Sequence, residues 1–150
     1  MRTIRVTRSM KISAEQAFDM MADHAGYTAF PGVRSAKVTK PGTTEPNGLG
    51  AIREVALRGA WVEEEITVFE RPRRLGYKIV RSRPPIEHEG GLIELTPTAD
   101  GVDVVWTSIF RVKIPIIGGL LTRIAARQMT ALFTRGLAIG EERARSRPAA

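Results

Sequence analysis

Apolar and polar residues alternate at the start of the chain, and β-rich runs recur from residue 33 to residue 112. Between Ile4 and Ile12, the apolar side chains Ile4, Val6, Met10 and Ile12 fall on even positions, which predicts a strand with one buried face. Similar runs predict about six further strands, at residues 33–40, 50–58, 61–70, 75–82, 86–96 and 102–112. Short turn sequences separate the later runs, so we expect an antiparallel meander.

Helical spacing of apolar residues occurs in two places. Ser13 begins a capping-box sequence with Gln16, and the residues after it predict a short helix to about His24. A compact turn or second short helix is expected at 27–32, and a long amphipathic helix over 115–145. Strands grouped apart from helices indicate an α+β domain in which the long helix covers a curved sheet. This arrangement predicts a cavity between the sheet and the helix.

Length and composition narrow the classes of protein. The 150 residues suit one domain, 1–150, with a frayed tail at about 146–150. The absence of cysteine excludes disulfides, thiolate metal sites and a cysteine nucleophile, and two histidines argue against a histidine-rich metal centre. No GxSxG, HExxH, EF-hand or nucleotide-binding motif is present, so we expect no cofactor and no metal. Without an apolar run of membrane-spanning length or a signal peptide, a cytoplasmic location is expected.

The chain is basic, with 23 Lys and Arg against 16 Asp and Glu and a net charge of +7. The arginines are spread along the whole sequence and are interrupted by acidic runs at 63–65 and 141–142. Nucleic-acid-binding proteins gather their cations on one face, so no nucleic-acid partner is expected. A weak attraction to anionic membranes is a further prediction, through Ile116, Ile117 and the arginines of the long helix.

Five stretches, in this order and spacing, carry a resemblance that covers nearly the whole chain: SMKISAEQAF (9–18), YTAFPG (27–32), GLGAIR (48–53), EEITVFERPRRLGY (64–77) and LTPTADGVDVVW (95–106). The chain resembles the SRPBCC superfamily, the START and Bet v 1-like helix-grip proteins, and within it the bacterial polyketide cyclase/dehydrase-like group. The resemblance implies a curved antiparallel sheet of about seven strands around a long C-terminal helix, with two short helices after the first strand. It also implies an apolar ligand cavity, which different members use for carriage, hormone binding or aromatase/cyclase chemistry.

Charged residues on apolar strand faces are the first candidates for a site. Arg8 interrupts the apolar face of the first strand, and Glu64 shares the phase of apolar neighbours. Either Arg53 or Glu54 faces the interior from the preceding strand, and the pattern leaves this choice open. An inward arginine needs a partner, because an unpaired buried charge is costly. An Arg–Glu pair in the cavity is either a ligand-orienting pair or a structural ion pair, and both readings stay open.

Proton-transfer chemistry suggests a second set of candidates. His88, Glu64 and Tyr77 are the candidate catalytic residues of a polyketide aromatase/cyclase or dehydratase, in which Arg8 or Arg53 would polarise a carbonyl. The favoured reading of His88 is nevertheless a surface or edge histidine, because its neighbours are polar. The favoured reading of His24 is a cation at a helix C-terminus.

Binding of a small hydrophobic or aromatic ligand, lipid-like or polyketide-like, is the primary hypothesis for function. Its alternatives are the enzyme just described and a peripheral membrane protein in lipid handling or assembly. The pattern leaves a monomer or a homodimer open. The expected ligand contacts, beside Arg8 and Arg53, are Trp61, Trp106, Phe30, Ile124 and Gln128. Core packing is the alternative for Trp61 and Tyr77 and the favoured reading for Trp106.

Overall fold

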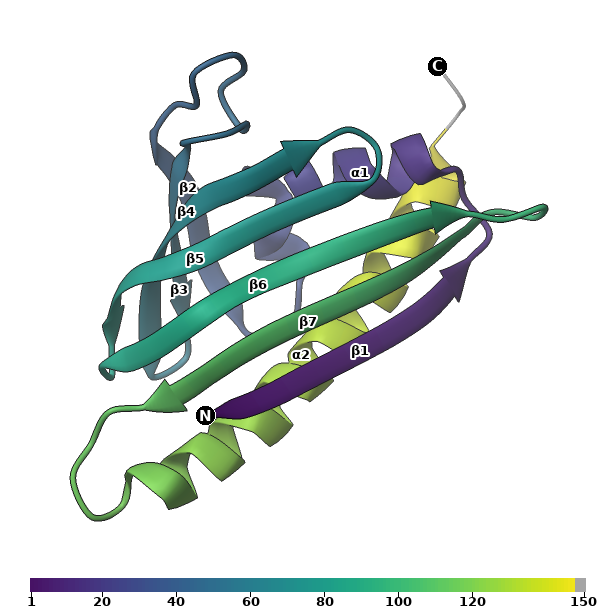
Figure 1. Ribbon diagram of the computed structural model, residues 1–150. Helices are drawn as coiled ribbons and strands as arrows, with labels where there is room; N and C mark the ends of the chain where they lie inside the picture. Colours follow the sequence, from purple (N-terminus) through teal and green to yellow (C-terminus); the bar gives the residue numbers. More distant parts are fainter. Residues whose placement is uncertain (148–150) are drawn as a thin grey trace.

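Seven antiparallel strands form one curved sheet, and the long helix α2 runs diagonally along one side of it (Figure 1). The computed structural model describes residues 1–147. The predicted tail at 146–150 therefore lies mostly outside the described residues, and Ser146 is still helical. The elements are, in chain order, β1 (Arg2–Met10), α1 (Ala14–Ala22), the 3-10 helix η1 (Ala25–Ala29), β2 (Val33–Lys40), β3 (Ile52–Leu57), β4 (Ala60–Glu70), β5 (Arg74–Arg83), β6 (Ile86–Pro97), β7 (Val102–Val112) and α2 (Gly118–Ser146).

The strand order across the sheet is β1-β7-β6-β5-β4-β3-β2. Strands β2 to β7 form a meander, and β1 pairs antiparallel with β7 at the opposite edge from β2. The predicted α+β helix-grip fold is thereby confirmed, and residues 1–147 form seven strands, two α-helices and a 3-10 helix.

Local sequence explains where the helices begin and end. The predicted capping box is present: Gln16 N donates to Ser13 Oγ (3.0 Å), and Ser13 N donates to Gln16 Oε1 (2.9 Å). Helix α1 ends at Ala22, before the predicted limit at His24. Helix α2 starts at Gly118 rather than at residue 115, because residues 115–117 form a turn.

The core lies between the concave face of the sheet, α1 and the second half of α2. Alternate residues of β7 are buried along its whole length, as expected for a strand with one covered face. The Trp106 ring of β7 stacks on Phe133 of α2, with ring centroids 3.7 Å apart and planes 8° from parallel. Helix α2 therefore packs directly against the concave face of the sheet at this point. Within residues 1–147, no helix is long and apolar enough to cross a membrane.

Candidate functional site

A buried ion pair joins two neighbouring strands on the concave face. Arg53 of β3 lies opposite Glu64 of β4, and its Nε donates to Glu64 Oε1 at 3.0 Å. The exposed fractions of the two residues are 2% and 7%. The predicted inward direction of Glu64 is confirmed, and the open choice on β3 is decided for Arg53. Glu54 faces the other side, where it lies opposite Glu63.

The connection between α1 and η1, and η1 itself, supply two more partners of the guanidinium. Arg53 Nη1 lies 2.9 Å from His24 Nδ1 and 3.0 Å from Tyr27 Oη. Because an arginine only donates, His24 Nδ1 accepts, and His24 Nε2 donates to the carbonyl of Asn47 (3.0 Å). Burial, and then the charge of Arg53, lower the pKa of His24 to about 3. His24 is therefore neutral, and its reading as a helix-terminal cation was wrong.

Two tyrosine rings flank the Arg53 guanidinium, each with its centroid 5.0 Å from Cζ: Tyr27 and Tyr77. The Tyr27 hydroxyl donates to the carbonyl of Met21 while it accepts from Arg53, so its hydrogen bonds hold η1 against the site. Burial by itself would lower the pKa of Arg53, but Glu64 and the tyrosines raise it above its usual value. Arg53 is thus a permanent cation inside the fold.

One nitrogen of Arg53 and one oxygen of Glu64 stay without a protein partner. Hydrogen bonds engage Arg53 Nε and Nη1, whereas Arg53 Nη2 and Glu64 Oε2 form none within residues 1–147. Every fully buried side-chain polar atom of the described residues has a partner, so these two atoms keep some access to solvent. The ion pair consequently keeps one donor and one acceptor atom available to a ligand.

Aromatic side chains connect this ion pair to α2. Trp106 Nε1 donates to the Tyr77 hydroxyl at 2.9 Å. The Trp106 ring also stacks on Phe133 of α2. Gly91 of β6 makes room for the tyrosine, because a Cβ at that position would lie 2.1 Å from Tyr77 Cζ. The Arg53 guanidinium, Tyr77, Trp106 and α2 thus form one continuous packed series.

His88 lies behind Tyr77 and is buried, so its favoured reading as a surface or edge histidine was wrong. The two rings are stacked with centroids 5.6 Å apart. His88 Nδ1 accepts from the backbone N–H of Ile79, and its Nε2 donates to Ser108 Oγ, both at 2.9 Å. Burial and then the nearby Lys78 lower the pKa of His88 to about 4. The ring is neutral at pH 7, and its basic nitrogen is already occupied.

The remaining predicted contacts divide between the interior and the surface. Phe30 is buried, stacks on Tyr27 with centroids 5.2 Å apart, and packs against α2 at Gly136. Trp61 lies on the opposite face of β4 from Glu64, beside Arg81. Two predicted contacts on α2 are exposed: Ile124 and Gln128.

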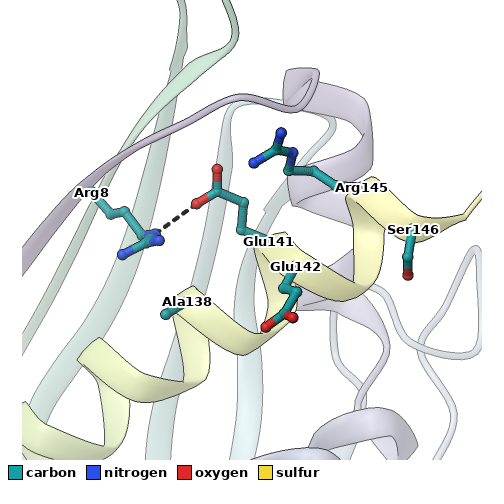
Figure 2. Close-up of a pocket in the computed structure, with 6 residues that line it drawn as sticks. All are labelled: Arg8, Ala138, Glu141, Glu142, Arg145 and Ser146. Atoms are coloured by element: carbon teal, nitrogen blue, oxygen red, sulfur yellow. Dashed lines mark hydrogen bonds and ion pairs between the residues drawn. The ribbon is translucent and has the colours of Figure 1, made fainter.

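Arg8 belongs to a separate location at the rim, where β1 meets the C-terminal part of α2 (Figure 2). Its Nε donates to Glu141 Oε1 at 2.8 Å, and Glu141 Oε2 accepts from the backbone N–H of Lys11 at 2.9 Å. This pair borders an open pocket of about 510 Å³ that is also lined by Ala138, Glu142, Arg145 and Ser146. Arg8 therefore has the partner that its position requires, but it does not join the Arg53 site.

Sequence reasoning missed His24 and Tyr27 as members of the site. Tyr27 lies in the YTAFPG stretch that carried the family resemblance, which is the one available signal. Within residues 1–147, no group of three or more His, Asp or Glu side chains is placed to hold a metal ion.

Comparisons with known proteins agree with this geometry at the level of the fold. The structure is similar to TTHA0849 from Thermus thermophilus (TM-score 0.75, 20% identity, covering 97% of this chain and 98% of that one). It is also similar to a START superfamily protein from Mycobacterium smegmatis (0.72, 11%, 95% and 97%) and to a protein from Thermobifida fusca (0.70, 23%, 96% and 93%).

Among curated proteins, none matches the sequence. Residues 1–145, which include β1, the buried Arg53 site and nearly all of α2, match the family described as "Polyketide cyclase / dehydrase and lipid transport". The match spans far more than half of the chain and agrees with the helix-grip fold. The chain therefore belongs to the polyketide cyclase/dehydrase and lipid transport family.

Proposed function

We propose that the protein binds a small, mainly apolar ligand in the interior of the helix-grip fold, and that Arg53 and Glu64 hold its polar end. One observation carries the proposal: Arg53 Nη2 and Glu64 Oε2 have no protein partner within residues 1–147, although their residues are almost fully buried. Both atoms keep some access to solvent, so a polar group of a ligand can take the place of water at them. A ligand oxygen and hydroxyl would complete this pair.

The charges of the pair indicate which polar group fits. Arg53 Nη2 can donate to a carbonyl or hydroxyl oxygen, and Glu64 Oε2 can accept from a hydroxyl. A carboxylate would meet the negative charge of Glu64 at the same point, so a neutral ligand group is favoured. The surrounding aromatic rings of Tyr27, Tyr77 and Trp106 suit a flat or ring-containing apolar body.

The alternative of a cyclase or dehydratase has less support from the geometry. His88 would have to give up the hydrogen bond from Ile79 N–H before its Nδ1 could take a proton. Burial raises the pKa of Tyr77, which makes the phenol a weaker acid at neutral pH. Of the three candidate catalytic residues, Glu64 alone keeps a free acceptor atom, and one such group supports binding better than a paired acid and base.

Three probes with one aromatic body test the polar anchor: naphthalene, naphthol and naphthoate, titrated by calorimetry. We expect naphthol to bind more tightly than both others, since it alone satisfies the donor and the acceptor. Glu64→Gln should narrow the gap between naphthol and naphthoate, whereas the matched rim variant Glu141→Gln should leave it unchanged.

Equal binding of naphthol and naphthalene would contradict the anchor. Failure of all three probes, together with the absence of a retained small molecule in native mass spectrometry of protein from its own host, would contradict interior binding altogether.

A further inference from the structure

The turn before α2 and the first turns of this helix present apolar side chains to solvent. Ile116 is fully exposed, and Ile117, Leu120 and Ile124 are each exposed by 44% or more. The four residues follow one another at the end of the molecule where β7 leads into α2 (Figure 1). We call Ile116, Ile117, Leu120 and Ile124 the apolar tip. Contiguous exposed apolar residues of this kind mark interaction surfaces.

The backbone at the tip is strained in a way that packing does not explain. Ile116 has φ 69°, a left-handed conformation that is an outlier for a β-branched residue. Its side chain is fully exposed, so no contact with the rest of the protein compensates for this conformation. Strained residues without a packing reason are concentrated at functional positions.

The segment that carries the tip has charges of one sign, and Glu87, the acidic residue opposite Arg111 at the end of β7, is paired with that arginine. The sequence from 112 to 140 contains no Asp or Glu, and it carries the cations Lys113, Arg123, Arg127 and Arg135. All four are exposed, and none of the ion pairs within residues 1–147 includes them. Arg2 pairs with Phe110 at the end of β7, so the positively charged N-terminus lies at the same end of the sheet.

We propose that the apolar tip docks on an anionic lipid bilayer, with Ile116, Ile117 and Leu120 in the interfacial layer and Lys113, Arg123 and Arg127 against the headgroups. Apolar residues bordered by unpaired cations are the combination that interfacial binding requires. A second copy of the chain fits less well, because a symmetric interface would place the two cationic faces against each other. The proposal concerns the outer surface and does not depend on a ligand at Arg53.

Vesicle co-sedimentation with the full chain tests the docking. Vesicles of phosphatidylcholine alone are compared with vesicles that contain about 30% phosphatidylglycerol, at about 0.1 M and about 1 M NaCl. We expect binding to the anionic vesicles at low salt and its loss at high salt or without the anionic lipid. The triple variant Lys113→Gln/Arg123→Gln/Arg127→Gln should weaken partitioning by about 100-fold, because each cation near the surface contributes roughly a factor of five.

Two matched controls separate this site from general charge and hydrophobicity. Arg34→Gln/Lys37→Gln/Lys40→Gln removes the same charge from β2 and should bind like the wild type. Ile116→Ser/Ile117→Ser/Leu120→Ser should abolish binding, whereas Val80→Ser on β5, whose 44% exposure equals that of Ile124, should not change it. Circular dichroism of each variant is the check that it is folded.

Depth is measured with Ile116→Trp, whose emission should shift to the blue and be quenched by brominated lipid, unlike Val80→Trp. Equal loss of binding in the β2 and α2 charge variants would overturn the proposal. So would a dimer that the serine variant dissociates while anionic vesicles bind nothing, since that result assigns the tip to a second copy.

Discussion

Two arginines on strands of the same sheet each pair with a glutamate, and their surroundings differ sharply. Arg53 bonds to Glu64 across the neighbouring strands β3 and β4 and also contacts His24 and Tyr27, and its side chain is 2% exposed. Arg8 bonds to Glu141 of α2 at the rim, and its side chain is 36% exposed. A buried ion pair gains little net stability over apolar residues, because desolvation offsets the attraction. The interior pair therefore calls for a functional explanation, which the rim pair does not need.

The largest expected effect comes from removing one partner of the interior pair. Arg53→Met leaves the Glu64 carboxylate buried without its cation and His24 Nδ1 without its donor. The free energy of unfolding in urea should fall by about 3–5 kcal/mol. The double variant Arg53→Met/Glu64→Leu should recover part of this loss, since the uncompensated charge is gone. A double variant less stable than Arg53→Met would contradict this account of the pair.

The two histidines predict a strong dependence of stability on pH at the interior site. Both have pKa values lowered from 6.5, to about 3 for His24 and about 4 for His88, so the unfolded chain binds protons that the folded chain does not. Stability is therefore complete above pH 6.5 and falls as the pH decreases towards 4. Each histidine should contribute a loss of about 2 kcal/mol between pH 7 and pH 5.

Urea titrations at several pH values measure this slope. His24→Gln and His88→Gln should each reduce the loss between pH 7 and pH 5 by about half, whatever their effect on absolute stability. Burial tends to raise the pKa of Glu141, but the Lys11 amide and Arg8 hold it below its usual value. The contribution of Glu141 is thus lost below pH 4.5, and Glu141→Gln should not change the slope above pH 5. An unchanged slope in both histidine variants would show that other groups cause the acid sensitivity.

The spacing of apolar residues along the sequence was sufficient to predict the fold, but it did not predict which residues make up the site. Runs of apolar and β-branched residues between turn sequences identified all seven strands, and alternation was clearest where one face is covered, as on β1 and β7. On β3 it failed to choose between Arg53 and Glu54, because Ile52 and Ala56 give one face about as much apolar character as Val55 and Leu57 give the other. Trp61 was predicted to contact the ligand together with Glu64. Residues three positions apart on a strand lie on opposite faces, so Trp61 faces away from Glu64.

The partners of the buried arginine depend on contacts that are distant in sequence. His24 lies 29 positions from Arg53 and is oriented by the Asn47 carbonyl in the loop between β2 and β3. Arg8 was expected to need a partner, but Glu141 is 133 positions away and becomes its neighbour only when α2 packs on β1. Neither pairing leaves a local pattern, because both arise from the packing of helices against the sheet.

A smaller effect is expected from the glycine that supports the aromatic side of the interior site. Gly91→Ala places a Cβ against the Tyr77 ring, which must move away from Trp106 and Arg53. Such overpacking should destabilise the fold by about 1–3 kcal/mol and change the fluorescence of Trp106. Gly119→Ala is the matched control: it has no neighbour within 4 Å and should stabilise α2 by up to about 1 kcal/mol. Equal destabilisation by both would argue against the Tyr77 contact.

The smallest effect is expected at the rim. Arg8→Gln should lower the free energy of unfolding by less than about 1 kcal/mol, because solvent screens a pair whose arginine is 36% exposed. Glu141 also keeps its hydrogen bond from the Lys11 amide, so its carboxylate is not left without a partner as Glu64 would be. A double-mutant cycle with Glu141→Gln measures the coupling, which should decrease with added salt. A coupling that equals or exceeds that of Arg53 and Glu64 would show that burial does not distinguish the two pairs. It would also contradict the proposal that the interior pair is kept to hold a ligand.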